Sequence, residues 1–263
     1  MKASDRLDPD LLSQGCQVSE VGHKVLVFES TSSTNDIAAE YSRNPLNHGL
    51  VVFAEQQQHG RGRSGHTWIG RHGQSLLCSI VLIHTQLKAE CLSLSSAVAV
   101  AEAIGPMARI KWPNDILIGP QKVCGILLES RQWPTHQAFI LGVGINCHQR
   151  REDFPDALEA SATSLDMVLK TQTDRTRLAR RVFSSLDLWL AHAMHDPDTV
   201  VSAWERSSML LGQRLGITYK NRSYHGHCIG VDPQQGLILQ LDQGVVRMFD
   251  AAHSSITKPQ TYP

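Results

Sequence analysis

A glycine- and arginine-rich segment joins two strand-like runs in the first third of this chain, and it restricts the folds available to it. The segment runs from Glu55 to Trp68 and reads EQQQHGRGRSGHTW. Its glycines satisfy the spacing GxGxxG of dinucleotide-binding folds, which need a strand before the glycines and a helix after them. Here a run rich in strand formers, Ser75–Ile83, follows the glycines instead of a helix. The acidic residue that the fingerprint requires on a second strand, at a set distance after the glycines, is also missing. The sequence therefore excludes a dinucleotide-binding βαβ unit and predicts two strands flanking a loop.

The chemistry of this loop suits a bound anion. Glycine lets the backbone approach a ligand closely, and the guanidinium groups of Arg61 and Arg63 offer paired donors to phosphate or carboxylate. An isolated GxG would be an ordinary solvated turn. The interleaved arginines and the closing Trp68 favour a loop that wraps around an anionic ligand.

The overall composition excludes several classes of protein. Lys and Arg number 25, as do Asp and Glu, so no net field favours nucleic acid or an anionic membrane as a partner. No apolar run approaches the length of a membrane span, and the N-terminal residues lack a signal-peptide core. The 263 residues, 41% of them hydrophobic, suffice for one large domain or for one domain plus a small one.

The cysteines and histidines predict neither a disulfide framework nor a metal centre. No CxxC pair occurs, and reduced cysteines inside apolar runs behave as small hydrophobes, which favours a cytoplasmic location. His225-Gly226-His227-Cys228 is the best local group of metal ligands, but it lies in an alternating, strand-like segment. The six cysteines are Cys16, Cys78, Cys91, Cys124, Cys147 and Cys228.

Periodicity and turn residues predict the order of elements. Residues 1 to about 22 read as irregular, and too few for a helix-turn-helix domain. A capping box at Ser33–Asp36 predicts a helix start. Further helices are expected at Leu92–Ile104, Arg175–Ala193 and Asp198–Leu210. Strands are expected at Val25–Phe28, Leu50–Ala54, Leu76–Ile83, Arg109–Trp112, Ile116–Ile118, Val123–Glu129 and Phe139–Ile145.

The pattern of the sequence changes after Gly212, from helix-like periodicity to short strand-like runs. Short strand-like runs separated by Gly, Pro, Asn and Asp predict a small β-barrel. These runs are Leu215–Tyr219, His225–Val231, Leu237–Leu241 and Val245–Phe249. We therefore expect two packed domains, residues 1–211 and 212–263.

Five short motifs follow one another over about half of the chain, mostly at the ends of expected strands. They are Ser33-Thr34-Asn35, the arginine loop with GRGRSGHTW, Lys111-Trp112-Pro113-Asn114-Asp115, Lys122-Val123-Cys124-Gly125-Ile126-Leu127 and Gly142-Val143-Gly144-Ile145-Asn146. In order and content this set resembles the biotin protein ligases. The resemblance implies an α+β catalytic domain with a mixed sheet, similar to class II aminoacyl-tRNA synthetases and biotin and lipoate ligases, followed by a C-terminal SH3-like β-barrel.

The resemblance also implies an activity and its substrates. ATP would activate the carboxylate of biotin as biotinoyl-5′-AMP, with Mg²⁺ as cofactor. The biotinoyl group would then pass to a lysine of a biotin carboxyl carrier domain. The enzyme would be a cytoplasmic biotin–[biotin carboxyl carrier protein] ligase, monomeric or homodimeric. It would hold two anions together and keep water from a reactive anhydride.

The family motifs assign roles to individual residues. Arg63 matches the arginine that holds the adenylate, and Lys122 matches the catalytic lysine; Asn114 and Asp115 would add to catalysis and offer oxygen ligands to Mg²⁺. A second ordering loop, on the adenosine side, would fall at residues 154–165. The expected substrate-binding residues are Ser33, Thr34, Asn35, Gln57, Gly60, Arg61, Gly62, Arg63, Trp68, Lys111, Lys122, Gly125, Gly142, Gly144 and Asn146.

Simpler structural interpretations stand beside these roles. Ser33 to Asn35 alone would read as a helix cap, Lys122 as a solvated hairpin lysine, and Asn114-Asp115 as a turn. Arginines of the stretch 174–181 alternate with a regular apolar face, which favours a solvated helix surface over a nucleic-acid site.

The chain departs from the family pattern twice. His66 stands where the family loop usually has an arginine, which removes one expected contact to ATP. Asp250–Ser255 lacks the usual glycine-acidic pattern before serine.

Three other functions are weighed against this activity. A lipoate or octanoate ligase would lack the combination of KWPND and GRGRxG. A DNA-binding regulator would need an additional N-terminal domain. A non-catalytic biotin-binding module draws its support only from His66.

Overall fold

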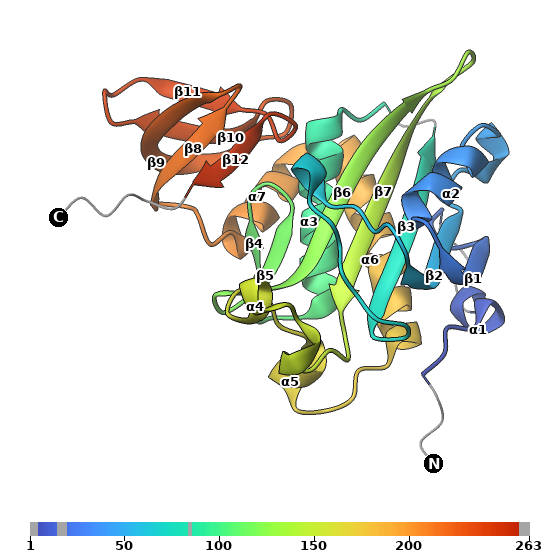
Figure 1. Cartoon of the computed structure of the whole chain (residues 1–263). Coiled ribbons are helices and arrows are strands. Elements are labelled where there is room, and N and C mark those ends of the chain that lie inside the picture. The colour runs from blue at the N-terminus through green and yellow to red at the C-terminus, as the bar shows by residue number, and fades with distance from the viewer. Residues whose placement is uncertain (1–4, 15–19, 84–85, 258–263) are drawn as a thin grey trace.

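A computed structural model describes residues 5–14, 20–83 and 86–257. The described residues form one seven-stranded mixed sheet in the order β1-β2-β3-β7-β6-β5-β4, shown in Figure 1. Only β1 and β2 pair in parallel; every other neighbouring pair is antiparallel. The strands are β1 (Val25–Thr31), β2 (Val51–Gln57), β3 (Ser75–Ile83), β4 (Ala108–Lys111), β5 (Asp115–Ile118), β6 (Gln121–Gln132) and β7 (Gln137–Asn146).

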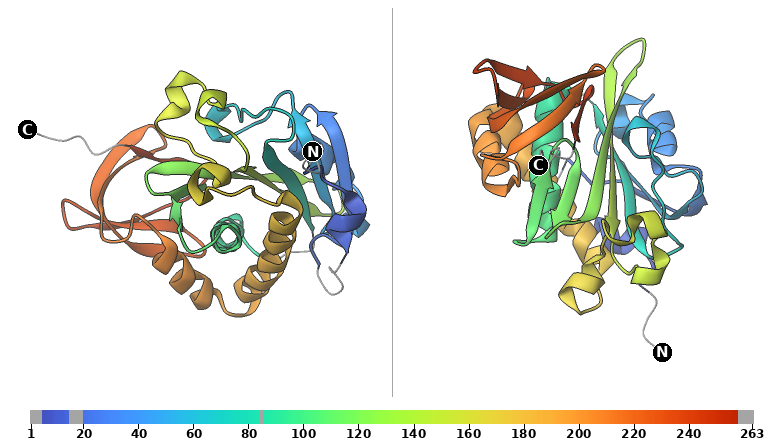
Figure 2. Two further views of the ribbon diagram at one scale, coloured as in Figure 1. Left: turned by 90° about the horizontal axis from the view of Figure 1, so that it is seen from below. Right: turned by 60° about the vertical axis from the view of Figure 1, so that its left-hand side comes forward.

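Helices cover both faces of this sheet. On one face lie α3 (Ala89–Ile104), α6 (Arg175–His195) and α7 (Pro197–Ser207), visible as a separate layer in Figure 2. On the other face, Ala38 and Ala39 of α2 (Thr34–Tyr41) pack against Leu50, Val52 and Ile140. Because β3 is covered on both faces, all nine of its residues are buried, which explains its uninterrupted apolar run.

A second, antiparallel sheet follows near the C-terminus of the described chain. Its strand order is β11-β10-β9-β8-β12, which is consistent with the expected SH3-like barrel. Its strands are β8 (Arg214–Tyr219), β9 (Arg222–Asp232), β10 (Gly236–Leu241), β11 (Val246–Phe249) and β12 (Ser254–Thr257). It packs on Trp112, whose indole N–H donates to Ser254 Oγ at 2.9 Å and whose ring meets that of Trp204 edge-on.

The structure corrects several sequence-based expectations. A short helix, α1 (Pro9–Ser13), lies in the segment expected to be irregular; Asp8 caps it, with Pro9 at its first position. Ser33 stands at the N-cap of α2 but makes no side-chain capping bond, so the capping box is wrong. Strand β12 and the short elements between β7 and α6 were missed. The latter are η3 (Arg151–Asp153), α4 (Asp156–Glu159) and α5 (Leu165–Leu169).

The cysteines of the described ranges are free and buried. Burial raises the pKa of Cys78 and of Cys147 to about 12, and that of Cys228 to about 11, so these thiols act as apolar packing groups. Cys16 lies outside the described residues. His227 is exposed beside the buried Cys228, because neighbouring residues of a strand face opposite ways. Within the described ranges no helix has the length and apolar character needed to cross a membrane.

Candidate active site

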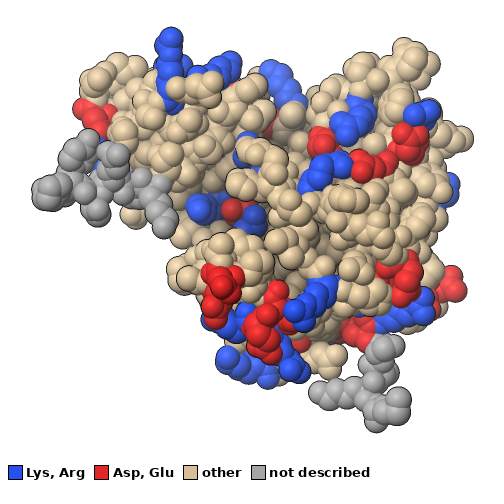
Figure 3. All heavy atoms as spheres, in the orientation of Figure 1, with Lys and Arg blue, Asp and Glu red and all other residues tan. Residues whose placement is uncertain are grey.

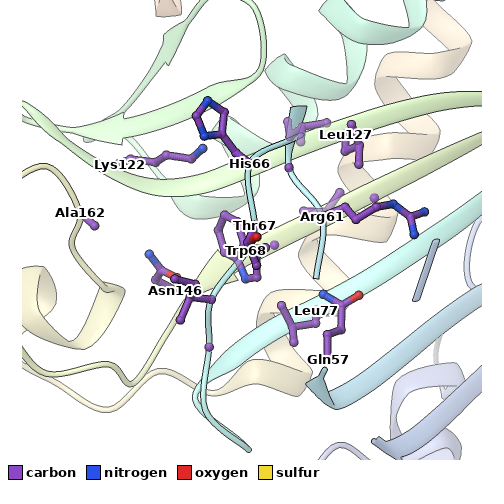
Figure 4. A pocket seen from close by; sticks show the side chains of 18 of the residues that line it. Gln57, Arg61, His66, Thr67, Trp68, Leu77, Lys122, Leu127, Asn146 and Ala162 are labelled. Atoms are coloured by element: carbon purple, nitrogen blue, oxygen red, sulfur yellow. The ribbon is translucent and has the colours of Figure 1, made fainter. Parts of the chain in front are cut away.

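A cavity of about 330 Å³ opens where the five motifs meet, at the ends of β2, β5, β6 and β7. Basic and acidic side chains both reach the surface in the hollow beside the second sheet (Figure 3). Figure 4 shows the lining side chains converging from the arginine loop and from several strands. Of the residues expected to bind substrate or catalyse, those that line the cavity are Ser33, Thr34, Asn35, Gln57, Arg61, Gly62, Arg63, Trp68, Asn114, Asp115, Lys122, Gly125, Gly142, Gly144 and Asn146.

Two expected residues are not part of this lining in the described chain, Gly60 and Lys111. Gly60 serves the loop backbone: its carbonyl accepts from Trp68 N at 2.9 Å, and a Cβ there would lie 2.6 Å from Trp68 O. Lys111 ends β4 just before the cis peptide bond of Trp112–Pro113. The hairpin of β4 and β5 thus reaches the site through Asn114 in its turn and Asp115 at the start of β5.

One end of the cavity is a neutral polar network. Gln57 Oε1 accepts from Thr34 N at 2.7 Å and from Thr34 Oγ1 at 3.0 Å. Ser79 Oγ lies 2.7 Å from Thr34 Oγ1 and 2.5 Å from Asn35 Oδ1. Thr34, Asn35 and Ser79 are all buried, so their hydrogen bonds fix the side chains in place. Ser79 was missed in the sequence, where its one signal is a hydroxyl within an apolar strand.

The glycines of β6 and β7 make room for side chains of the chain itself. A Cβ on Gly142 would lie 2.4 Å from Asn35 Oδ1, and Cβ atoms on Gly125 and Gly144 would lie 2.9 and 2.7 Å from the Trp68 ring. The Trp68 indole therefore lies on the sheet and forms a wall of the cavity. Its Nε1 is buried without a hydrogen-bond partner among the described residues.

Arg61 is held by two carboxylates next to the polar network around Asn35. Its guanidinium lies 2.7 Å from Asp36 and 3.2 Å from Glu129, which also accepts from Asn35 Nδ2 at 2.7 Å. Burial opposes its charge, but the bonds to Asp36 and Glu129 outweigh burial and raise the pKa of Arg61. In Figure 4 the guanidinium of Arg61 points away from Trp68 and Lys122. Its backbone, rather than its charge, therefore faces the cavity.

Arg63 joins the arginine loop to the second sheet. Its Nη2 donates to the carbonyl oxygen of Ala251 and, at 3.4 Å, to that of Ser254. Ala251 N in turn donates to the carboxylate of Glu90 at 3.1 Å. Burial lowers the pKa of Arg63. Because carbonyl oxygens carry only partial charge, an anion in the cavity would compete for this guanidinium.

Lys122, on β6, brings an ammonium group into the lining of the cavity. Its Nζ lies 2.6 Å from Asp115 Oδ1 and 5.7 Å from the centre of the Trp68 ring. Its backbone is tied to the facing segment, because Lys122 N donates to Ser161 O at 2.8 Å and Lys122 O accepts from Thr163 N at 2.9 Å. The ammonium group thus lies beside Asp115 and Trp68, on a strand tied to residues 161–163.

The opposite wall is formed by residues that follow β7. Asn146 Nδ2 donates to Thr163 O at 3.0 Å, and its Oδ1 accepts from Gln149 Nε2 at 3.2 Å. Gln149 was missed in the sequence, where it carries no motif signal. Within the expected ordering loop, the residues that line the cavity are Phe154, Pro155, Leu158, Ser161 and Ala162.

Asn114 and Asp115 do not fit a resident Mg²⁺ in this arrangement. Asn114 Nδ2 donates to Ile126 O at 2.8 Å, so the amide of Asn114 takes part in hydrogen bonding within the sheet. The carboxylate of Asp115 is paired with Lys122. Across the ranges that the structure describes, no three His, Cys, Asp or Glu side chains gather closely enough to hold a metal ion.

Comparison with known proteins places this site in a family. Residues 27–146 match the model of the biotin/lipoate A/B protein ligase family. The chain is 30% identical over 260 residues to the bifunctional ligase/repressor BirA of Bacillus subtilis, covering 95% of this chain and 80% of that protein. The chain belongs to the biotin/lipoate A/B protein ligase family. This confirms the family predicted from the five motifs.

Other members of the family match over most of the chain. The biotin–[acetyl-CoA-carboxylase] ligase of Mycobacterium tuberculosis is 28% identical, with 82% of this chain and 85% of that protein covered. The structure of biotin protein ligase from Aquifex aeolicus in complex with biotin and ATP superposes with a TM-score of 0.78. It is 23% identical, with 89% of this chain and 99% of that one covered. The shared architecture confirms the expected α+β fold.

Proposed function

We propose that this chain is an ATP-dependent ligase that activates biotin as biotinoyl-5′-AMP and transfers it to a lysine of a biotin carboxyl carrier domain. The proposal rests on one arrangement. The lining of one cavity combines a neutral polar network of Thr34, Asn35 and Gln57 with the Lys122 ammonium. Biotin has a neutral cyclic urea at one end and a carboxylate at the other, which matches these two kinds of group. Relatives named as biotin ligases support the assignment.

The first half-reaction joins two anions. A carboxylate oxygen of biotin attacks the α-phosphorus of ATP, the bond to the β-phosphate oxygen breaks, and pyrophosphate leaves. Thr34, Asn35 and Gln57 would hold the urea, while Lys122 lies where the carboxylate and the α-phosphate meet. Its positive charge lowers their repulsion and stabilises the charge that develops on phosphorus. The nucleotide substrate would be MgATP, in which the metal ion belongs to the nucleotide.

The second half-reaction needs no covalent enzyme intermediate. The neutral amine of the acceptor lysine attacks the carbonyl carbon of the mixed anhydride, AMP leaves, and the amine releases a proton as the amide forms. The enzyme's task is to retain the anhydride and exclude water until the acceptor arrives. The arginine loop, with Trp68 on the sheet beneath it, is placed for that task.

A lipoate or octanoate ligase is the alternative within the family. Lipoate carries an apolar dithiolane and octanoate an alkyl end, and neither offers a polar group to Thr34, Asn35 and Gln57, which line this end of the cavity. An apolar ligand there would remove these polar side chains from water without giving them a hydrogen bond in return. The polar end of the cavity therefore favours biotin.

Exchange of labelled pyrophosphate into ATP, without any carrier protein, tests the first half-reaction directly. Exchange that requires biotin and is not supported by lipoate would establish the activity. Transfer is then read as biotin incorporated into a purified carrier domain. Protein that binds biotin but shows no exchange would overturn the proposal in favour of a non-catalytic biotin-binding module.

Replacing Arg63 by glycine is expected to release reactive biotinoyl-adenylate. The change removes the guanidinium that reaches the second sheet and faces the cavity. Loss of a charge-assisted hydrogen bond of about 1.5–3 kcal/mol corresponds to roughly 10- to 100-fold faster escape of the intermediate. The measurement is biotin label on lysines of an added non-acceptor protein. Arg222→Gly, at the exposed start of β9, is the control, and labelling by Arg63→Gly no higher than with the parent enzyme would contradict the prediction.

Replacing His66 by arginine is expected to tighten ATP binding. His66 lines the cavity and stands where the family loop usually has an arginine. A guanidinium at this position would gain a charge-assisted contact to phosphate, which corresponds to about three- to tenfold in the KM for ATP. The KM for biotin should stay unchanged. His66→Gln serves as the comparison, because it offers an N–H donor without charge; equal tightening by both variants would argue against a charge-assisted phosphate contact.

A further inference from the structure

A cluster of ionisable side chains lies outside the cavity, behind the wall that follows β7. His148 lies between two carboxylates, with Nε2 2.8 Å from Asp5 Oδ2 and Nδ1 2.8 Å from Asp166 Oδ2. Asp5 is also bound by Arg175, whose Nε lies 3.0 Å from the same oxygen. The cluster therefore joins the N-terminal segment, the chain after β7, α5 and α6. None of these side chains lines the cavity in the described chain.

The geometry at His148 requires a protonated ring. Each imidazole nitrogen faces a carboxylate, and an ionised carboxylate only accepts hydrogen bonds, so both nitrogens must donate. The hydrogen bond to Asp5 raises the pKa of His148, and the bond to Asp166 adds to it, while partial burial opposes them. The side chain of His148 is 16% exposed, so solvent screens these contacts only in part.

The segment that His148 holds is the wall expected to face the nucleotide. Residues 146–149 and 163–166 are joined by several bonds: Asn146 to Thr163 O, Ser164 Oγ to Gln149 O at 2.7 Å, and Asp166 N to Cys147 O at 3.0 Å. The residues between these two stretches supply Phe154, Leu158 and Ala162 to the cavity. The pair of His148 with Asp166 closes the base of this loop on the side away from the cavity.

We propose that His148 is a positioning residue for the nucleotide, whose imidazolium bridges Asp5 and Asp166 and thereby fixes the loop 149–165 and docks the N-terminal segment against it. This inference rests on the proposed function, because that function identifies the nucleotide as the ligand bound against the loop 149–165. It assigns the N-terminal segment a part in substrate binding, although the described residues of that segment do not touch the cavity.

The groups that face His148 determine how the bridge responds to pH. Asp5 and Asp166 contact the ring, Arg175 contacts Asp5, and Glu55 lies 2.7 Å from Arg175. A histidine whose pKa is raised in the folded protein contributes stability below its ordinary value of about 6.5, and this contribution is lost as the pH rises through the raised value. The bridge is therefore fully present below about pH 6.5 and weakens as the pH rises through the raised pKa of His148.

The test is steady-state pyrophosphate exchange by the full chain carrying His148→Asn, compared with the parent between pH 6 and pH 9. Loss of hydrogen bonds to a charged group predicts a rise of about tenfold in the KM for ATP at pH 6, where the parent imidazole is protonated. The KM for biotin and kcat should change by less than about twofold, because the polar end and Lys122 are untouched. The KM for ATP of the parent should rise with pH, and that dependence should flatten in the variant.

His72→Asn is the matched control. His72 also pairs with a carboxylate, that of Glu29 at 2.7 Å, but both side chains are exposed and neither lines the cavity. Hydrogen exchange of peptides covering residues 147–166 provides a readout independent of activity, and faster exchange is expected in His148→Asn alone. This hydrogen-exchange measurement distinguishes failure of the present proposal from failure of the proposed ligase function. If the parent enzyme showed no pyrophosphate exchange, the ligase function would be refuted, but hydrogen exchange would still report whether His148 fixes the loop. An unchanged KM for ATP with unchanged loop exchange, or an equal rise in both KM values, would overturn the proposal.

Discussion

Replacing Lys122 by alanine is expected to lower turnover by about 10²–10³, the range found when one preorganised electrostatic contact to a transition state is removed. Lys122 Nζ lies 2.6 Å from Asp115 Oδ1 and 5.7 Å from the centre of the Trp68 ring. An ammonium group that is already oriented by such contacts stabilises charge at phosphorus without having to reorganise during the reaction. The loss should appear mainly in kcat of pyrophosphate exchange, because the neutral network that binds the urea stays intact.

Two companion variants sharpen this prediction. Lys122→Arg keeps the charge but spreads it over a planar group that is larger than the ammonium, so it should recover only part of the activity. Lys24→Ala, at the start of the sheet edge, is the control, because Lys24 binds Asn47 and does not line the cavity. A loss below threefold in Lys122→Ala would show that Lys122 is a solvated hairpin lysine with no part in the chemistry.

The motif residues could be predicted because each motif combines a strand end with a distinctive residue type. Gly142 and Gly144 show the limit of that reasoning. The sequence indicates that something approaches the strand closely there, but the register Ser79↔Gly142 and Leu77↔Gly144 is needed to place Asn35 and Trp68 on these glycines. The side chains of the enzyme, and not the ligand alone, fill the space that the glycines leave.

Ser79, Glu129 and Gln149 could not be assigned for the same reason. A serine in an apolar strand and a glutamate near a hairpin carry no local signal of function. Their roles follow from partners that are distant in the chain: Glu129 accepts from Asn35, 94 residues away, and Ser79 contacts Asn35, 44 residues away. Hydrophobic periodicity reports which face of an element is buried, not which polar groups meet across strands.

The interpretation of the stretch 174–181 as a solvated helix face was wrong for Arg175. Its arginines alternate with apolar residues, which is typical of an exposed face. Yet the side chain of Arg175 is 1% exposed, and its Nη1 lies 2.7 Å from Glu55 Oε2, which is equally buried. The partner is 120 residues away in the sequence, and only the closing of β2 against α6 brings the two charges together.

Replacing Arg175 by methionine is therefore expected to lower the free energy of unfolding by about 3–5 kcal/mol, because it leaves the carboxylate of Glu55 buried without its counter-charge. Arg175 also donates to Ser75 O at 3.0 Å, and Glu55 Oε1 accepts from Leu7 N at 2.8 Å. The guanidinium thus ties β3 and the N-terminal segment to α6 through groups that solvent does not reach. The measurement is equilibrium unfolding in urea, with Arg177→Ala on the exposed face of α6 as the control, expected within about 0.5 kcal/mol of the parent.

The double variant Arg175→Met with Glu55→Gln separates the loss of the ion pair from the loss of packing. If the buried charge causes the destabilisation, removing it should restore a large part of the stability, since replacing both partners of a buried pair costs far less than removing one. A single variant within about 1 kcal/mol of the parent, or a double variant no better than the single one, would show that packing and not charge holds α6 to the sheet at this point.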